Sequence, residues 1–498
     1  MDSDGDVQIP SNVTRISRCI EQEGVDEKTG RSISQIVYYQ AGVGTEDNFY
    51  AKYVGGATGK GLSEHIREAY SFICNNYHNG DEIFLIGFSR GAFTARSISS
   101  LIHAVGLLTP NGLVYFYQIF QDWEYQLKDG WKSSYPTQPW PHRPKLNTPQ
   151  YRRKLLELEL TRPDIPIKAV AVWDTVGSLG IPMIALFPQP PSTDFSFVDT
   201  KVEPNIEHAF QALALDERRR SFKPTIWEKD DKNAWPRVLK QCWFPGVHSD
   251  VGGGYSNMDL ANLTLAWMIS QLDPLLSFNQ GYVVQQNRLS MESHEKEGQK
   301  VRDWGLGQIH NSMTFFFRLG GTKVRTPMEY ESTDPKTHLP TGKRLKHTNE
   351  TVHSSVRIRM GRQGLGYNDK GTYDSEALQG WTLNGIETTP SSLGLPDGSK
   401  AGRMKQVKWV KDDATTKEKL EMPEDEIGEF EREIMLAWPD IYSEFDAIRP
   451  GTHAASVKRS STYPNDHPGT VNAEVGKDAP KLDVNGVGHR HPDRVGTI

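Results

Sequence analysis

The stretch DEIFLIGFSRGAFTARS (residues 81–97) decides which fold the sequence predicts. A short apolar run leads into the motif G-x-S-x-G, which extends from Gly87 to Gly91, and a helical pattern follows it. A strand, a tight turn and a helix in this order predict a nucleophile elbow, a turn that exposes the hydroxyl of Ser89. The turn also directs the amino end of the helix at that hydroxyl, so the backbone N–H of Arg90 is a candidate oxyanion donor. In the alternative interpretation, Ser89 is an ordinary hydroxyl in a structural turn.

Strand and helix patterns alternate on both sides of this stretch. Such alternation predicts an α/β fold with a mostly parallel sheet and helices on both of its faces. The run at 83–87 is short, apolar and bounded by turn residues, which is typical of a fully buried strand. The expected elements are a strand at 35–40, a helix at 61–80, a strand at 83–87, a helix at 92–108, and strands at 165–174 and 237–244.

The composition excludes several classes of protein. With 36% hydrophobic and 24% charged residues, the chain resembles a soluble globular protein. Its net charge of −6 gives no overall attraction to nucleic acid, so no nucleic-acid partner is expected. The three cysteines, Cys19, Cys74 and Cys242, lack the paired spacing of a zinc site or a disulfide framework. No metal and no cofactor are expected.

The sequence also bears on localisation. No apolar stretch approaches the roughly 18 residues that span a bilayer. The first residues lack the basic and then apolar run of a secretory signal. We therefore expect a cytoplasmic protein.

The chain is expected to divide into three parts. Residues 1–315 form the α/β domain, and 316–449 form a C-terminal α+β extension with a helix within 424–438. Residues 450–498 are polar and lack periodicity, which predicts a disordered tail.

Residues 107–164 are aromatic and proline-rich, and we expect them to be an insertion over the carboxyl ends of the strands. The insertion is either an apolar cover that would suit an acyl-chain substrate or a packed subdomain without substrate contact. A second apolar loop is expected at 181–197.

Two downstream residues can complete a hydrolase site with Ser89. A serine hydroxyl becomes nucleophilic when a histidine takes its proton and a carboxylate orients that histidine. Asp174 follows the buried strand at 165–174, and His248 follows the strand at 237–244. Both should lie at the carboxyl edge of the sheet, where open α/β sheets bind ligands. The order Ser, Asp, His is that of α/β-hydrolases.

Each of these residues also has a plainer interpretation. Asp174 could cap the turn that follows its strand, and His248 could be a loop histidine or a metal ligand together with Asp250. His208 lies in an apolar run that is interpreted as a helix, where a core histidine is expected.

Other conspicuous residues are not expected to be catalytic. Asp216 and Glu217 precede three arginines and are expected to form an ion-pair cluster. The glycines at 252–254 could allow backbone to approach a ligand, but no G-K-[ST] follows them, so they are not a phosphate loop.

With these residues established, the sequence resembles a largely uncharacterised α/β-hydrolase family that is related to the catalytic domain of type VI secretion phospholipase effectors. The resemblance covers about residues 11 to 270. It rests on five stretches in one order: QIVYYQAGVGT, GDEIFLIGFSRGAFTAR, VWDTVGSLG, HAFQALALDERRRSFKPTIW and CWFPGVHSDVGGGY. The family's triad corresponds to Ser89, Asp174 and His248. Its effector members hydrolyse phospholipid esters, while many others, including fungal ones, have no assigned substrate.

One departure from the family concerns the first strand. Family members usually have a strand ending in an Asp-Gly-Thr-like turn upstream of the segment that matches NVTRI at 12–16, and no apolar strand precedes that segment here. In this fold, that strand lies between the strand expected at 35–40 and the strand at 83–87, and the loop after it usually gives a second oxyanion N–H. An incomplete gene model, replacement by another segment and a degenerate enzyme would each explain the departure; we favour the first.

The function that we expect is hydrolysis of carboxylic esters through Ser89, His248 and Asp174, with esters of phospholipids or other acyl lipids as candidate substrates. The expected partners are an ester or lipid substrate and, transiently, a membrane surface. A thioesterase or peptidase would use the same three residues. The competing class is a binding or scaffold protein that kept the hydrolase sheet without its activity.

Overall fold

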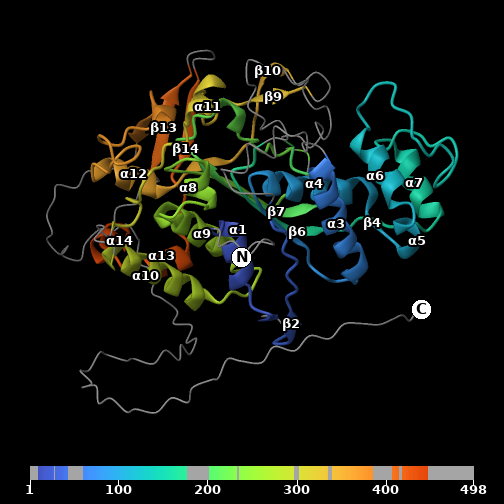
Figure 1. Cartoon of the computed structure of the whole chain (residues 1–498), viewed down its shortest axis with the longest axis horizontal. Helices are drawn as coiled ribbons and strands as arrows, with labels where there is room; N and C mark the ends of the chain where they lie inside the picture. Colours follow the sequence, from blue (N-terminus) through green and yellow to red (C-terminus); the bar gives the residue numbers. More distant parts are fainter. Residues whose placement is uncertain are drawn as a thin grey trace, which may run out of the picture. The chain divides into compact units, whose positions relative to one another are not determined.

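The centre of the molecule is a five-stranded parallel sheet in the order β11-β8-β7-β6-β3. Figure 1 labels two of its strands, β6 and β7. The computed structural model describes residues 9–26, 29–42, 60–176, 201–230, 232, 235–296, 302–334, 339–384, 407–413 and 418–446. Within these residues, the strands are β1 Glu23–Val25, β2 Ser32–Ser34, β3 Phe84–Phe88, β4 Leu107–Leu108, β5 Thr161–Arg162, β6 Ile167–Trp173, β7 Ile206–Ala214, β8 Val238–Phe244, β9 Glu331–Thr333, β10 Pro340–Arg344, β11 Glu350–Val352, β12 Thr382–Asn384, β13 Lys408–Asp412 and β14 Lys419–Pro423.

Helices cover both faces of the sheet, as the alternation of elements predicts. The described helices are α1 Asn12–Cys19, α3 Lys60–Asn76, α4 Arg90–Val105, α5 Pro110–Leu113, α6 Phe116–Glu124, α7 Pro149–Glu157, α8 His248–Gly252, α9 Asp259–Leu272, α10 Gln280–Lys296, α11 Phe315–Leu319, α12 Ser354–Gly361, α13 Glu429–Met435 and α14 Pro439–Asp446, with the 3₁₀ turns η1 Arg220–Phe222 and η2 Glu376–Leu378.

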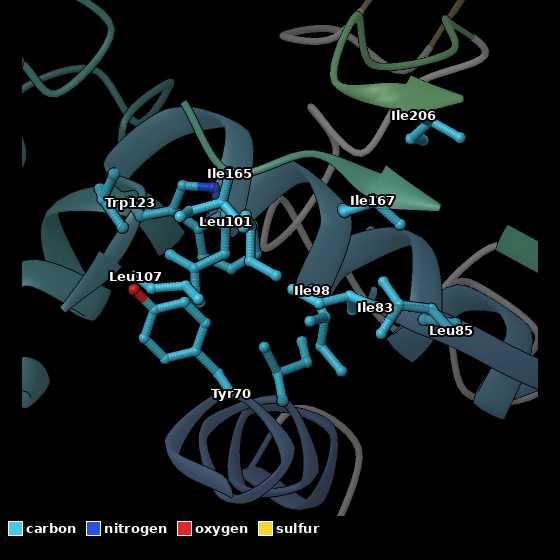
Figure 2. Close-up of a cluster of buried hydrophobic side chains, with 14 of the residues drawn as sticks. Tyr70, Ile83, Leu85, Ile98, Leu101, Leu107, Trp123, Ile165, Ile167 and Ile206 are labelled. Atoms are coloured by element: carbon cyan, nitrogen blue, oxygen red, sulfur yellow. The ribbon is translucent and has the colours of Figure 1, made fainter. Parts of the chain in front are cut away.

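The side chains of β6 divide the hydrophobic core into two layers. Val170 and Val172 pack with α3 and α4 in one cluster, whereas Ala171 and Trp173 pack with α1, α9 and α13 in another. Figure 2 shows part of the first cluster, with Tyr70 of α3 and Leu101 of α4. Successive residues of a strand point to opposite faces, so the two clusters lie on the two sides of the sheet. The expected α/β fold is therefore present, and the helices expected at 61–80 and 92–108 are α3 and α4.

The segment at 35–40 is not the strand that its composition predicts. It is irregular, and the side chains of Ile36 and Val37 are exposed. Tyr38 instead stacks on Phe72 of α3, with ring centroids 4.6 Å apart. A strand needs a neighbouring strand to pair its backbone hydrogen-bonding groups. No described strand lies between this segment and β3, so the segment has no such neighbour there. Within the described residues β3 pairs on one side only, and its side chains alternate between buried and half-buried rather than being fully buried.

The helix expected around His208 is also wrong, because this run forms β7, between β6 and β8. Alanine and leucine favour helices locally, but pairing on both edges and cover on both faces outweigh that preference. His208 is half-buried on this strand.

The insertion at 107–164 packs against α3 and α4, and its expected position over the carboxyl ends of the strands stays a prediction. It begins and ends at the antiparallel pair of β4 and β5, next to the carboxyl end of α4. Ser89 lies at the other end of this 16-residue helix, roughly 24 Å away along its axis. Trp123 and Tyr151 are fully buried against α3 and α4. This burial favours the subdomain interpretation of the segment over the acyl cover.

The C-terminal region contributes to the central sheet. Its strand β11 pairs in parallel with β8, with Thr351 opposite Cys242. The helix expected within 424–438 is α13. The domain boundary at 315 stays a prediction, and the loop expected at 181–197 and the tail at 450–498 lie outside the described residues. No described helix combines the length and apolar composition that a bilayer crossing requires.

Candidate active site

Ser89 forms the whole turn between β3 and α4, as the elbow motif predicts. Its backbone lies at φ +58° and ψ −118°, a conformation that costs a residue other than glycine about 1–3 kcal/mol. The N–H of Ser89 donates to the carbonyl oxygen of Trp173 at 3.1 Å, which fixes the turn against the end of β6. Arg90 is the first residue of α4, so its N–H lies at the amino end of that helix.

The two glycines of the motif have different roles. A Cβ on Gly87 would lie 2.3 Å from the carbonyl oxygen of Gly91, whereas a Cβ on Gly91 would meet no atom within 4 Å. Of these two glycines, only Gly87 is therefore required for steric reasons.

We expect Gly87→Ala to lower the free energy of unfolding by about 3 kcal/mol or more, because the new methyl group forces the turn open. Gly91→Ala is the matched control. It should keep or raise that free energy by up to about 1 kcal/mol, since alanine is the better helix former. Chemical denaturation measures both, and equal destabilisation by the two substitutions would contradict the steric argument.

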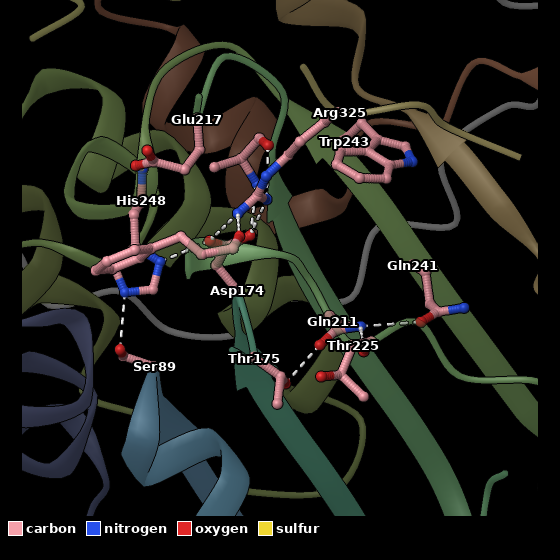
Figure 3. A network of polar contacts seen from close by, with 12 residues as sticks. Ser89, Asp174, Thr175, Gln211, Glu217, Thr225, Gln241, Trp243, His248 and Arg325 are labelled. Carbon is pink, nitrogen blue, oxygen red and sulfur yellow. Dashed lines mark hydrogen bonds and ion pairs between the residues drawn. The ribbon is translucent and has the colours of Figure 1, made fainter. Parts of the chain in front are cut away.

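His248 joins the serine to the carboxylate (Figure 3). Its Nε2 lies 2.8 Å from Ser89 Oγ, and its Nδ1 lies 2.6 Å from Asp174 Oδ2. Because an ionised carboxylate only accepts, Nδ1–H donates to Asp174, which leaves Nε2 to accept from the serine hydroxyl. The rings of Phe88 and Phe222 flank the imidazole at centroid distances of 4.6 and 4.9 Å. The structure thus brings together the three residues that the sequence singled out, although His248 begins a short helix rather than lying in a loop.

Asp174 lies directly after β6 and is fully buried. Its Oδ1 accepts from the N–H of Ala214 on the neighbouring strand at 3.0 Å, so the carboxylate does not cap the turn that follows it. Burial alone would raise the pKa of Asp174, but the Arg325 guanidinium and the hydrogen bond from His248 hold it well below its usual range. The carboxylate therefore stays ionised and can orient the imidazole.

Arg325 is the site residue that sequence analysis missed. Both of its terminal nitrogens donate to Asp174: Nη1 to Oδ1, and Nη2 to Oδ2 at 2.9 Å. It is a single arginine within GGTKVRTP (320–327), a stretch without a motif, and it lies 151 residues after Asp174. No signal in the sequence connects the two.

Three buried carboxylates fix the backbone in front of the histidine. The N–H of Gly246 donates to Asp216 at 2.7 Å, that of Val247 to Asp250 at 2.9 Å, and that of His248 to Glu217 at 3.2 Å. Three consecutive N–H groups thus have three separate acceptors, which determines where α8 begins.

The other candidates from the sequence have structural roles. The expected ion-pair cluster forms only in part. Glu217 pairs with Arg219 at 2.9 Å and Arg218 with Glu376 at 2.9 Å. Asp216 instead accepts from the hydroxyls of Tyr373 and Ser375. Asp250 pairs with His310 at 2.5 Å, and the described residues contain no group of three metal-ligating side chains around it or elsewhere.

The run at 252–254 lets protein elements approach one another. A Cβ on Gly252 would lie 2.0 Å from the ring of Phe88, and one on Gly253 would lie 3.0 Å from the backbone of α1. In the described structure, these two glycines therefore permit contacts within the protein.

Glu217→Gln is expected to cost about 3 kcal/mol of stability at pH 7. The pKa of Glu217 lies at about 2, because Arg219 outweighs the burial that would raise it. A lowered pKa stabilises the fold above the unfolded value near 4.5, and this contribution disappears as the pH falls toward 2. The difference between parent and variant should therefore shrink between pH 4.5 and 2.

Denaturation at a series of pH values checks this expectation. Burial raises the pKa of Asp216 to about 6, but this group titrates in both proteins and cancels from the difference. A difference that stays constant with pH would mean that Glu217 is not charged in the fold.

The fold and the site define a class: an α/β protein with a hydrogen-bonded Ser–His–Asp chain at the carboxyl edge of its parallel sheet. The family model described as "T6SS, Phospholipase effector Tle1-like, catalytic domain" matches residues 1–271, more than half of the chain. The chain belongs to this family.

A curated relative is the uncharacterized protein YEL023C of Saccharomyces cerevisiae. It is 31% identical over 218 residues, which cover 39% of this chain and 28% of the yeast protein. The chain therefore matches less than a third of the length of that relative.

Proposed function

We propose that the chain is a serine hydrolase of carboxylic esters, and that its substrates are acyl lipids, phospholipids among them. The observation that carries the proposal is the hydrogen-bonded sequence Ser89–His248–Asp174, with both distances below 3 Å, at the end of β3 and β6. Membership of a family described as phospholipase effectors supports the lipid class.

In the proposed reaction, Ser89 Oγ attacks the ester carbonyl while His248 Nε2 takes the hydroxyl proton. Asp174 holds Nδ1–H and stabilises the imidazolium that forms. The N–H of Arg90 stabilises the negative oxygen of the tetrahedral intermediate. The intermediate collapses, His248 returns the proton to the departing alcohol, and a water molecule activated by the same imidazole then hydrolyses the acyl-enzyme.

Apolar side chains beside the histidine support an acyl substrate. Val176, Phe222, Met313 and Phe317 form a small buried cluster, and the ring of Phe222 contacts His248. An acyl chain that reached this cluster would gain about 0.8 kcal/mol for each methylene removed from water. An enzyme with such a substrate would contact a bilayer surface transiently.

The test measures acyl release from four substrates: short-chain nitrophenyl esters, phospholipid vesicles, an acyl thioester and a peptide. Ser89→Ala is the blank for each. Hydrolysis of the esters that disappears in the blank supports the proposal, and preference for vesicles over nitrophenyl esters supports the lipid class. A folded chain that is inactive on all four would favour a binding or scaffold protein instead.

A further inference from the structure

The two terminal nitrogens of Arg325 donate all of their hydrogen bonds within the site. Arg325 is 3% exposed, and besides its two bonds to Asp174 it donates to two carbonyl oxygens, that of Ala214 at 2.8 Å and that of Phe222 at 2.9 Å. Ala214 ends β7, and Phe222 is the residue whose ring packs on His248. Figure 3 shows Arg325 beside Asp174. This one side chain joins the carboxylate of Asp174 to the end of β7 and to the backbone of Phe222.

We propose that Arg325 is a positioning residue of the Ser89–His248–Asp174 site, and that the C-terminal region completes the site by supplying it. The inference rests on the proposed hydrolase function. It goes beyond that function because Arg325 lies outside residues 1–271, which match the family model.

Arg325 fixes the orientation of the Asp174 carboxylate, which the backbone donor alone does not do. Asp174 Oδ2 must accept from His248 Nδ1 in one orientation, and a planar guanidinium that grips both oxygens fixes the plane of the carboxylate. Without it, the carboxylate would keep the N–H of Ala214 as its donor at Oδ1 and could rotate.

The charge of Arg325 also keeps Asp174 ionised. A fully buried carboxylate without a cation tends to take up a proton, and a protonated Asp174 would no longer stabilise the imidazolium. The titratable and charged groups around Asp174 are His248, Arg325 and Tyr330. Glu217 and Tyr330 lie near Arg325, and both raise the pKa of its guanidinium. Without Arg325, burial therefore becomes the dominant influence on the pKa of Asp174, and it raises that pKa.

The experiment compares Arg325→Met with the parent chain. It measures kcat and KM for a nitrophenyl ester from pH 5 to 9, together with the rate at which a fluorophosphonate probe labels Ser89. We expect kcat to fall about 10²-fold with KM changed less than about threefold, because orientation of the base matters in the transition state. The acid limb of the rate profile should move up by about one pH unit as Asp174 becomes protonated.

The matched control is Arg359→Met. Arg359 is equally buried in the C-terminal region, but it donates to the carbonyl oxygens of Gly305, Gly307 and Leu365 rather than to the site. Its loss should lower stability without moving the acid limb. If Arg325→Met does not fold, Arg325→Lys serves instead. Lysine keeps the positive charge but cannot donate to both carboxylate oxygens in one plane. We therefore expect kcat to fall about tenfold, with the acid limb of the rate profile unchanged.

The outcomes separate the two proposals. A parent that is folded but neither labelled at Ser89 nor active would overturn the proposed function and this inference with it. A labelled, active parent whose Arg325→Met variant keeps its kcat and its acid limb would overturn the inference alone. Equal losses in the Arg325 and Arg359 variants, with no change of acid limb in either, would show that Arg325 is merely structural.

Discussion

Ser89→Ala is expected to lower kcat for ester hydrolysis by about 10⁴- to 10⁶-fold, the range in which removal of a serine nucleophile falls. The reason is that no other hydroxyl is placed at 2.8 Å from His248 Nε2 among the described residues. Stopped and steady-state assays with a nitrophenyl ester measure the loss, and the weak activity that remains would come from binding and oxyanion stabilisation.

Ser97→Ala is the control for this prediction. Ser97 is a buried serine on the same helix, α4, and its Oγ has no hydrogen-bond partner within the described residues. Its replacement should leave kcat within about twofold, since it removes a hydroxyl far from the imidazole. If Ser89→Ala kept a tenth of the parent activity, Ser89 would not be the nucleophile.

Asp174→Asn is expected to lower kcat about 10⁴-fold, because an amide no longer enforces the tautomer with the proton on Nδ1. It should also cost about 3–5 kcal/mol of stability, since Arg325 loses the negative charge that compensates its own while remaining buried. Steady-state kinetics and chemical denaturation of the same preparation check the two parts.

Asp122→Asn is the control that separates the loss of kcat from the loss of stability. Asp122 is a buried carboxylate in the insertion, where it pairs with Arg143 at 2.6 Å and accepts from Tyr151 at 2.7 Å. The substitution removes a similar ion pair outside the site, so it should lower stability comparably and leave kcat nearly unchanged. A similar fall of kcat in both variants would mean that the activity is lost through unfolding.

The elbow could be predicted from the sequence because its requirements are local. An apolar run, a glycine that tolerates no Cβ and a helix are adjacent in the chain, so one window of residues contains them all. Asp174 and His248 could be placed for a related reason: each follows a strand, and parallel strands bring their carboxyl ends to one edge.

The errors concern features that distant parts of the chain determine. The apolar run at 35–40 has strand composition but no described partner, and the run that forms β7 has helix composition but two partners. In both segments, hydrogen bonding to neighbouring strands rather than amino-acid composition determines the secondary structure. Arg325 could not be found because the fold alone brings it to Asp174. The acceptors of the Gly246 and His248 N–H groups, Asp216 and Glu217, likewise come from a segment about 30 residues earlier in the chain.

The late position of Arg325 has a consequence for synthesis on the ribosome. Chains grow at about 5–20 residues per second, so the arginine follows Asp174 by roughly 8 to 30 seconds. The strand β11, which pairs with β8, is made later still. A nascent chain can thus form the elbow long before the buried carboxylate receives its counter-charge. We expect hydrolytic competence to arise only when translation of this chain is well past its midpoint.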